Sequence, residues 1–385
     1  MKYILSIVLL LLISMQLQVR SQFKPSAGLN GYLSNMQSVM FEDGEGQWIA
    51  DNLFHNRLNF SSSLLKGLDF SLEMRNRLMY GETVKYTPGY ADLIAKDQAW
   101  LDMSWNLGEG DSYILNSSID RVYADITLGK LQATIGRQRI NWGMNFVWNP
   151  NDIFNSYSFF DFDYIERPGS DAIRLQYYVN STSSIEAVSK INNNEEWSIA
   201  GLVRVNAFGA DFQLLTGILD EKEYVLGLGI SRYIGPVSIS GEITYLDPKD
   251  DSPDLESATI GGVSLSYNTP FNLFIQFEYL YNSSVKNSSI SNFSDFYYRN
   301  LTLRDLSFTP HTFFTSLTYP ATPLLNLGVS AMFFPMLKGL YMGPSLDFSL
   351  RDDLDISFFM QTFKMGFAES DQKVNMGFLR LKWSF

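Results

Sequence analysis

The recurring alternation of apolar and polar residues is the feature that most constrains what this chain can fold into. Segments of about 8 to 13 residues alternate in this way, and each ends at Gly, Pro, Asn or Asp. In residues 68–80, LDFSLEMRNRLMY, one face is almost entirely apolar and the other carries the charges. A period of two residues is the pattern of a β-strand with two different faces. Because no helical period of any length interrupts this pattern after residue 22, the sequence predicts an all-β protein.

The connections between these segments alternate in length. Eight short turns and nine longer, mostly polar loops join eighteen expected strands, within a range of 16 to 18. The turns are expected near residues 66–67, 129–130, 180–182, 208–209, 235–236, 269–270, 320–323 and 351–352, and the loops at about 41–51, 81–112, 140–169, 191–195, 219–223, 247–256, 283–305, 335–339 and 364–373. This alternation is typical of an up-and-down transmembrane barrel with short periplasmic turns and longer external loops.

Residues 22–385 are therefore expected to form a single transmembrane, up-and-down antiparallel β-barrel. In lipid every backbone N–H and C=O must be paired internally, so a sheet that crosses the membrane has to close. The alternative is a soluble periplasmic all-β domain, which would expose its sheet edges and its apolar stripes to water.

The N-terminus predicts a signal peptide over residues 1–21. Lys2 precedes an apolar run over residues 4–13, and Val19-Arg20-Ser21 suits cleavage before Gln22. An uncleaved anchor is the alternative, but the run is shorter than the about 20 apolar residues that a spanning helix needs. We therefore expect export to the outer membrane.

Composition excludes several classes of protein. The formal charge of -12 argues against a nucleic-acid partner, which needs clustered Lys and Arg. With no cysteine and only two histidines, His55 and His311, neither a thiolate nor a histidine metal site is expected. The acidic loop 247–256 is interpreted as solvated, with a calcium site as the alternative, and the Asn/Ser-rich stretch 282–295 as another exposed loop. No cofactor is expected.

The last residues, GFLRLKWSF, predict a final strand with an aromatic end. Its lipid-facing residues are Leu379, Leu381, Trp383 and Phe385, and its inward residues are Arg380, Lys382 and Ser384. This pattern resembles the C-terminal signature of Gram-negative outer-membrane β-barrels. The resemblance implies that the barrel assembly machinery is a partner during biogenesis.

Charged residues on the polar faces are expected to line the lumen. Early strands carry Arg57, Arg75, Arg77, Arg121, Arg174 and Arg204, with Glu73 and Asp125 near them, and later strands carry Glu242, Glu278, Asp347 and Asp355. Closing the sheet would place a mainly basic wall opposite a mainly acidic one, and such rings of charge select solutes. The alternative is that these charges pair with one another and stiffen the wall.

The aromatic segment 144–168 is expected to fold into the barrel and constrict it. Eighteen strands enclose an aqueous channel that a loop can narrow, and Asp161 and Asp163 would add carboxylates to the narrow zone. Packing of this loop on the outer rim, in the aromatic girdle, is the alternative.

Just before this loop, LQATIGRQRINWG breaks the alternation. Continued regularly, it would point Arg137 and Arg139 toward lipid, at about 2 to 4 kcal/mol each near the midplane. A bulge or loss of pairing at Gly136 would instead turn both arginines into the lumen, and Ile140 and Trp142 toward lipid or the aromatic girdle. The stretch GRQRINWG, followed by WNPNDIFN, resembles a motif of porin-like barrels of Gram-negative bacteria. The resemblance covers about residues 136–155 and implies a channel wall that turns into an internal loop.

The predicted function is therefore a porin-like channel for passive diffusion of small polar or charged solutes, and not an enzyme. No G-x-S-x-G, P-loop or dinucleotide fingerprint occurs. One alternative is a barrel for polymer export or secretion, which would have a tall lumen with no loop across it. Another is a membrane enzyme with a Ser/His pair at the wall. No plug domain is expected between Gln22 and the first strand. The expected partners are outer-membrane lipid and small solutes, and the sequence leaves the oligomeric state open.

Overall fold

The computed structural model describes residues 25–42, 48–155, 159–160, 166–250, 252, 255–285, 293, 302–367 and 371–385. Their strands are β1 (Ser26–Glu42), β2 (Trp48–Leu65), β3 (Leu68–Gly81), β4 (Ser104–Gly110), β5 (Tyr113–Leu128), β6 (Leu131–Gln138), β7 (Ser170–Tyr178), β8 (Ser184–Ile191), β9 (Trp197–Ala207), β10 (Ala210–Leu219), β11 (Glu223–Ile234), β12 (Val237–Pro248), β13 (Ala258–Asn268), β14 (Phe274–Asn282), β15 (His311–Thr322), β16 (Leu325–Phe334), β17 (Gly339–Arg351), β18 (Leu354–Gly366) and β19 (Asp371–Ser384). The short helices are α2 (Glu82–Tyr86), α3 (Tyr90–Ala95), and the 3-10 turns η2 (Leu303–Asp305) and η3 (Pro335–Leu337).

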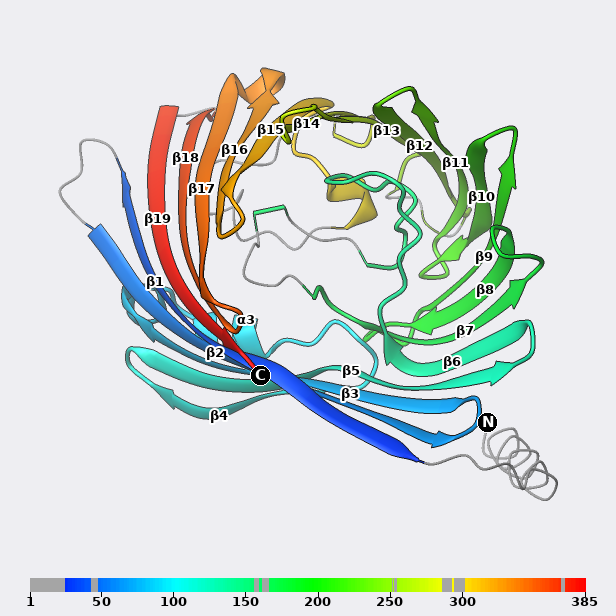
Figure 1. Cartoon of the computed structure of the whole chain (residues 1–385), viewed down its shortest axis with the longest axis horizontal. Coiled ribbons are helices and arrows are strands. Elements are labelled where there is room, and N and C mark those ends of the chain that lie inside the picture. Colours follow the sequence, from blue (N-terminus) through cyan, green and yellow to red (C-terminus); the bar gives the residue numbers. More distant parts are fainter. Residues whose placement is uncertain are drawn as a thin grey trace.

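Eighteen of these strands close into one antiparallel barrel (Figure 1). Each strand pairs with its neighbours in chain order, and β1 closes the ring by pairing with both β2 and β19. In the described part of the chain, β4 pairs with β5 alone and stands outside this ring. The predicted fold class and strand number are therefore confirmed.

Tight turns and longer connections alternate at the predicted positions. Four of the turns contain a glycine at positive φ: Gly67 at 79°, Gly129 at 61°, Gly209 at 72° and Gly235 at 59°. Such angles are easily reached only without a Cβ, which explains why these strands reverse direction here. The β3–β5 connection, predicted as a plain loop, additionally contains α2, α3 and the β4 strand.

The two faces of the strands differ as the alternation predicted. On β11, Leu226, Leu228 and Ile230 point outward and are 45–51% exposed, whereas Val225, which directly precedes them, is 2% exposed. An outward apolar band of this kind needs lipid around it. None of the helices within the described ranges has the length and apolar character needed to cross a membrane.

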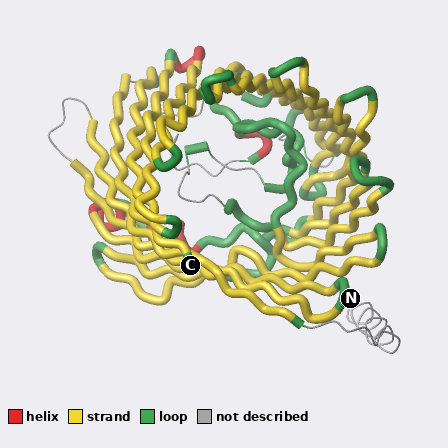
Figure 2. The backbone as a smooth tube through the Cα atoms, viewed as in Figure 1, coloured by secondary structure: helices red, strands yellow, loops and turns green. Residues whose placement is uncertain are grey.

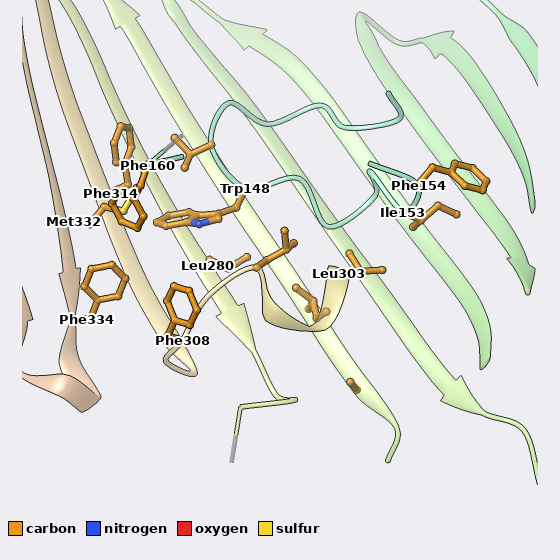
Figure 3. Packing of buried hydrophobic residues seen from close by; sticks show 14 of the residues in the cluster. Trp148, Ile153, Phe154, Phe160, Leu280, Leu303, Phe308, Phe314, Met332 and Phe334 are labelled. Atoms are coloured by element: carbon orange, nitrogen blue, oxygen red, sulfur yellow. The ribbon is translucent and has the colours of Figure 1, made fainter. Parts of the chain in front are cut away.

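The inside of the barrel holds much of the buried apolar material. Figure 2 shows the β6–β7 connection running along the inside of the ring of strands. Trp148 and Phe159 from this loop pack against Phe314 of β15. Phe160 of the loop and Leu303 and Phe308 of the β14–β15 connection lie in the same cluster (Figure 3). Two loops therefore fold inward and narrow the lumen.

In the β14–β15 connection, one described residue of the stretch 282–295 is buried, although the whole stretch was predicted to be an exposed loop. Phe293 belongs to the Asn/Ser-rich stretch predicted to be exposed, yet it is 6% exposed and its ring lies 5.1 Å from that of Phe363 on β18. Its backbone N–H donates to Gln372 on β19 at 2.9 Å. At this residue the loop is packed against the inner wall.

Candidate pore constriction

Glu242 on β12 binds the backbone of the β6–β7 loop. Its carboxylate accepts hydrogen bonds from the N–H groups of Met144, Asn145 and Asn151, the last two at 2.9 and 2.8 Å. Buried backbone donors need partners, and a carboxylate is a stronger acceptor than a neutral group. The carboxylate predicted to line the pore therefore holds the loop and is itself 4% exposed.

Glu278 on β14 makes the same type of contact further along the loop. It accepts hydrogen bonds from the N–H groups of Phe146, Val147 and Trp148 at 2.9 to 3.2 Å, and it is 1% exposed. Together the two glutamates accept hydrogen bonds from six backbone N–H groups, those of residues 144–148 and of Asn151. This segment has no regular structure of its own, so these contacts take the place of a strand ladder.

A third buried carboxylate, Glu186 on β8, joins the loop to the predicted arginines of the neighbouring strands. Arg174 of β7 donates to its Oε2 at 2.9 and 2.7 Å, and Arg204 of β9 lies 3.7 Å from Oε1. The Trp142 indole N–H donates to the same carboxylate at 3.0 Å. Glu186 was not predicted as a site residue, although its place between the outward-facing Ile185 and Ala187 marks it as an inward residue of β8.

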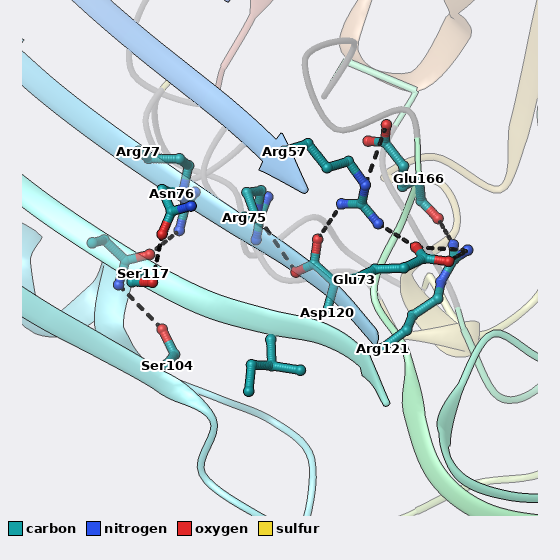
Figure 4. A network of polar contacts seen from close by, with 12 residues as sticks. Arg57, Glu73, Arg75, Asn76, Arg77, Ser104, Ser117, Asp120, Arg121 and Glu166 are labelled. Carbon is teal, nitrogen blue, oxygen red and sulfur yellow. Dashed lines mark hydrogen bonds and ion pairs between the residues drawn. The ribbon is translucent and has the colours of Figure 1, made fainter. Parts of the chain in front are cut away.

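The opposite wall carries an ionic network centred on Arg57 (Figure 4). The Arg57 side chain is 1% exposed and pairs with Glu73 of β3 and with Asp120 of β5, the latter at 2.5 Å. Arg75 lies 3.5 Å from Asp120, and Arg121 lies 3.3 Å from Glu73. The wall therefore contains its own counter-charges, as the alternative interpretation of these residues proposed.

A bulge in β5 brings two of these charges to the lumen side. Glu73 and Met74 are adjacent in β3, but they pair with Arg121 and Ile119, so Asp120 is an extra residue. An extra residue lets both members of a bulge point to one face. Further along the same strands, Arg77 donates to Asn116 of β5 at 3.0 Å.

Glu166 connects the returning end of the β6–β7 loop to this network. Its carboxylate lies 3.7 Å from the Arg57 guanidinium, and its backbone carbonyl accepts from Arg121. The loop is thus bound to β8, β12 and β14 on one side and to β2 and β5 on the other. Asp161 and Asp163 lie outside the described residues, so their pore-lining role stays a prediction.

Arg137 lies in the wall, and the expected bulge at Gly136 is wrong. The β6 pairing continues without a register shift, with Arg137 opposite Val122 on one side and Asp171 on the other. The guanidinium donates to Asp171 and Asp97 at 2.8 and 2.6 Å and to the Ile119 carbonyl at 3.2 Å. The Arg137 guanidinium therefore lies beside β5, between the end of β6 and the start of β4. The β3–β5 connection shields it from lipid.

The residues after Arg137 enter the loop. Ile140 and Trp142, expected to face lipid, are both 0% exposed and lie inside the barrel, because the chain leaves the wall immediately after β6. Arg139 is half-buried beside the loop residue Asp152, which is 2% exposed. Burial raises the pKa of Asp152 to about 7, against the opposing effects of the Arg139 charge and the Trp142 N–H.

None of these arrangements matches a metal site. Among the residues that the structure describes, no three His, Asp or Glu side chains are grouped so that they could hold a metal ion.

Comparisons with known proteins show the fold. No family model matches the chain, and no curated protein matches it. Solved structures that resemble it include OpdQ of Pseudomonas aeruginosa (TM-score 0.58, 11% identity, 93% of this chain and 97% of that one) and OccK11 (OpdR) of the same organism (0.57, 10%, 93% and 96%). OccAB2 of Acinetobacter baumannii is similar to the same degree (0.57, 11%, 93% and 98%).

Proposed function

We propose that this protein is a porin-like outer-membrane channel through which small polar or charged solutes diffuse passively. One observation carries the proposal: a loop held inside an eighteen-strand barrel by buried carboxylates, facing a wall of arginines. A loop in this position narrows the lumen. The similar Occ structures are outer-membrane porins, which supports the same function.

The charges left accessible favour anionic solutes. Arg174 and Arg204 have side chains that are 22% and 34% exposed, whereas their shared partner Glu186 is fully covered. Around Arg57 the exposure is balanced, because Arg75 and Arg121 are 13% and 17% exposed and Glu73 and Glu166 are 17% and 21% exposed. Glu242 and Glu278 are covered by the loop that they bind. Because wall charges select ions in a pore, the accessible charge of Arg174 and Arg204 beside the loop favours anions.

Planar-bilayer recordings test both parts of the proposal. In a KCl gradient we expect a stable conductance and a reversal potential of the sign given by anion preference. Arg204→Gln should weaken that preference, because Arg204 is the most exposed arginine of the set. Arg232→Gln, the same change on the outer face of β11 near the tight turn, is the matched control.

Two outcomes would overturn this proposal. Absence of channel current from correctly folded protein would exclude a diffusion channel, and cation preference would exclude the role given to the arginines. The loop inside the barrel counts against the alternative of a polymer-export conduit, which needs an unobstructed lumen.

Localisation follows from the same proposal. The barrel and its outward apolar band fit the outer membrane. The signal peptide over residues 1–21 lies outside the described residues and stays a prediction, as do delivery by the barrel assembly machinery and the oligomeric state.

A further inference from the structure

A small cavity lies on the inner wall at the loop end of the barrel, away from the constriction. It has a volume of about 180 Å³ and is bordered by β1, β2, β3 and β19, with Thr83 and Val84 of α2 and Tyr90 of α3 as additional lining residues. The two short helices belong to the β3–β5 connection. The cavity therefore sits where a solute would first meet the barrel interior.

Four methionines from three strands meet at this cavity. Met40 of β1 is directly opposite Met376 of β19, and Leu53 of β2 is directly opposite both Met36 and Met79. Side chains of directly opposite residues lie on the same face with their Cβ atoms about 5 Å apart. Register alone therefore gathers these thioethers into one patch.

Burial shows that the patch forms part of a packed wall. Met36, Met79, Met376 and Phe378 are each less than 10% exposed. The methionine side chain is unbranched and polarizable, so it adapts to a bound group and makes favourable contacts with aromatic rings. Phe378 and Tyr90 add ring surfaces to the same lining.

The charge of the lining limits what can bind. Asp51 is the only charged residue among the lining residues that the structure describes. Its carboxylate already accepts hydrogen bonds from the Thr83 backbone N–H at 2.8 Å and hydroxyl at 2.5 Å. An anion brought beside this carboxylate would be repelled and would lose its hydration, whereas a neutral hydroxyl can still donate to it.

We propose that this cavity, hereafter the methionine pocket, binds an uncharged monocyclic aromatic molecule such as a phenol. The size fits, because an apolar cavity of about 150 Å³ is enough to hold benzene. The methionine pocket therefore favours neutral molecules, whereas the constriction is proposed to favour anions. The methionine pocket thus adds to the proposed channel a separate binding site, whose occupancy does not depend on ion conduction.

Methionine-methyl NMR tests the pocket directly. The full-length protein in detergent micelles, labelled with ¹³C at the methionine methyl groups, is titrated with phenol and, separately, with benzoate. We expect saturable shifts of the Met36, Met40, Met79 and Met376 signals with a Kd of about 1 mM for phenol, and at least tenfold weaker binding of benzoate. Met336 and Met342, which are 41% and 46% exposed, report partition into the micelle.

Two neighbouring substitutions provide the matched comparison. Leu53→Trp fills the pocket and should abolish the saturable shifts, whereas Phe54→Trp, one residue on and 41% exposed on the outer face, should leave them unchanged. The wild-type titration stands even if Leu53→Trp fails to fold. The proposal would be overturned if the shifts rise without saturation and in parallel with those of Met336 and Met342, or if benzoate binds as tightly as phenol. Loss of channel current alone would contradict the proposed function and leave the methionine pocket unaffected.

Discussion

At the scale of single residues, Gly136 explains the break in alternation before Arg137 in a way that differs from the expected bulge. Its φ is +120°, and a Cβ at this position would lie 2.3 Å from the Val122 carbonyl oxygen on β5. The glycine lets β6 approach β5 closely at the point where Arg137 enters the wall, without any change of register. The break in alternation therefore marks a close backbone contact.

Gly136→Ala should destabilise the barrel by about 2 kcal/mol or more, since it adds both backbone strain and a steric clash. Urea unfolding of the refolded protein in micelles, followed by tryptophan fluorescence, measures the change. Gly201→Ala on β9 is the control, because its nearest contact would be 3.6 Å from the Glu186 carbonyl oxygen and its φ is ordinary. Equal stability of the two variants would contradict this account of Gly136.

At the scale of elements, the β6–β7 loop depends on two carboxylates of the wall. Glu242→Gln and Glu278→Gln keep the side-chain size but remove the charge, and they point an N–H₂ group at backbone donors. Losing hydrogen bonds to a charged group costs about 1.5 to 3 kcal/mol. We expect each variant to show larger current fluctuations and a higher mean conductance in planar bilayers. Asp355→Asn, an inward carboxylate of β18 that bonds to Ser349, should leave the traces unchanged.

The same loop is expected to respond to pH through Asp152. Its pKa, raised by burial to about 7 from an ordinary value of 3.8, means that the folded protein keeps a proton that the unfolded chain releases. The packing of the loop is then most stable below about pH 4 and weakens as the pH rises to about 7, with no further change above it. Current fluctuations should therefore be greater at pH 8 than at pH 5, and Asp152→Asn should reduce the difference. An unchanged pH dependence in that variant would place the titrating group elsewhere.

At the scale of the whole molecule, the barrel was predictable from sequence and the filling of its lumen was not. Each strand carries its own two-residue period, so faces, turns and strand number follow from local residues such as those of 68–80. The pattern placed Glu242 on the inner face, but its partner Met144 is 98 residues away and no local rule selects it. For the same reason the sequence left open whether the wall charges are free or paired, and it did not single out Glu186, Asp120 and Glu166 as the counter-ions. Period fixes which side a residue faces, whereas partners depend on how the loops fold into the closed barrel.

The position of the loop in the conducting barrel can be tested by fixing it there. The chain has no cysteine, so Asn145→Cys combined with Ser240→Cys introduces a unique pair at a loop–wall contact whose oxygen atoms are 2.7 Å apart. If solutes pass beside the loop in this position, the oxidised double variant should conduct like wild type with reduced current fluctuations. Asn145→Cys with Ser238→Cys, two residues along the same face of β12, should not cross-link and is the control. Loss of conductance on oxidation, restored by reduction, would mean that the loop has to leave the wall for the channel to open.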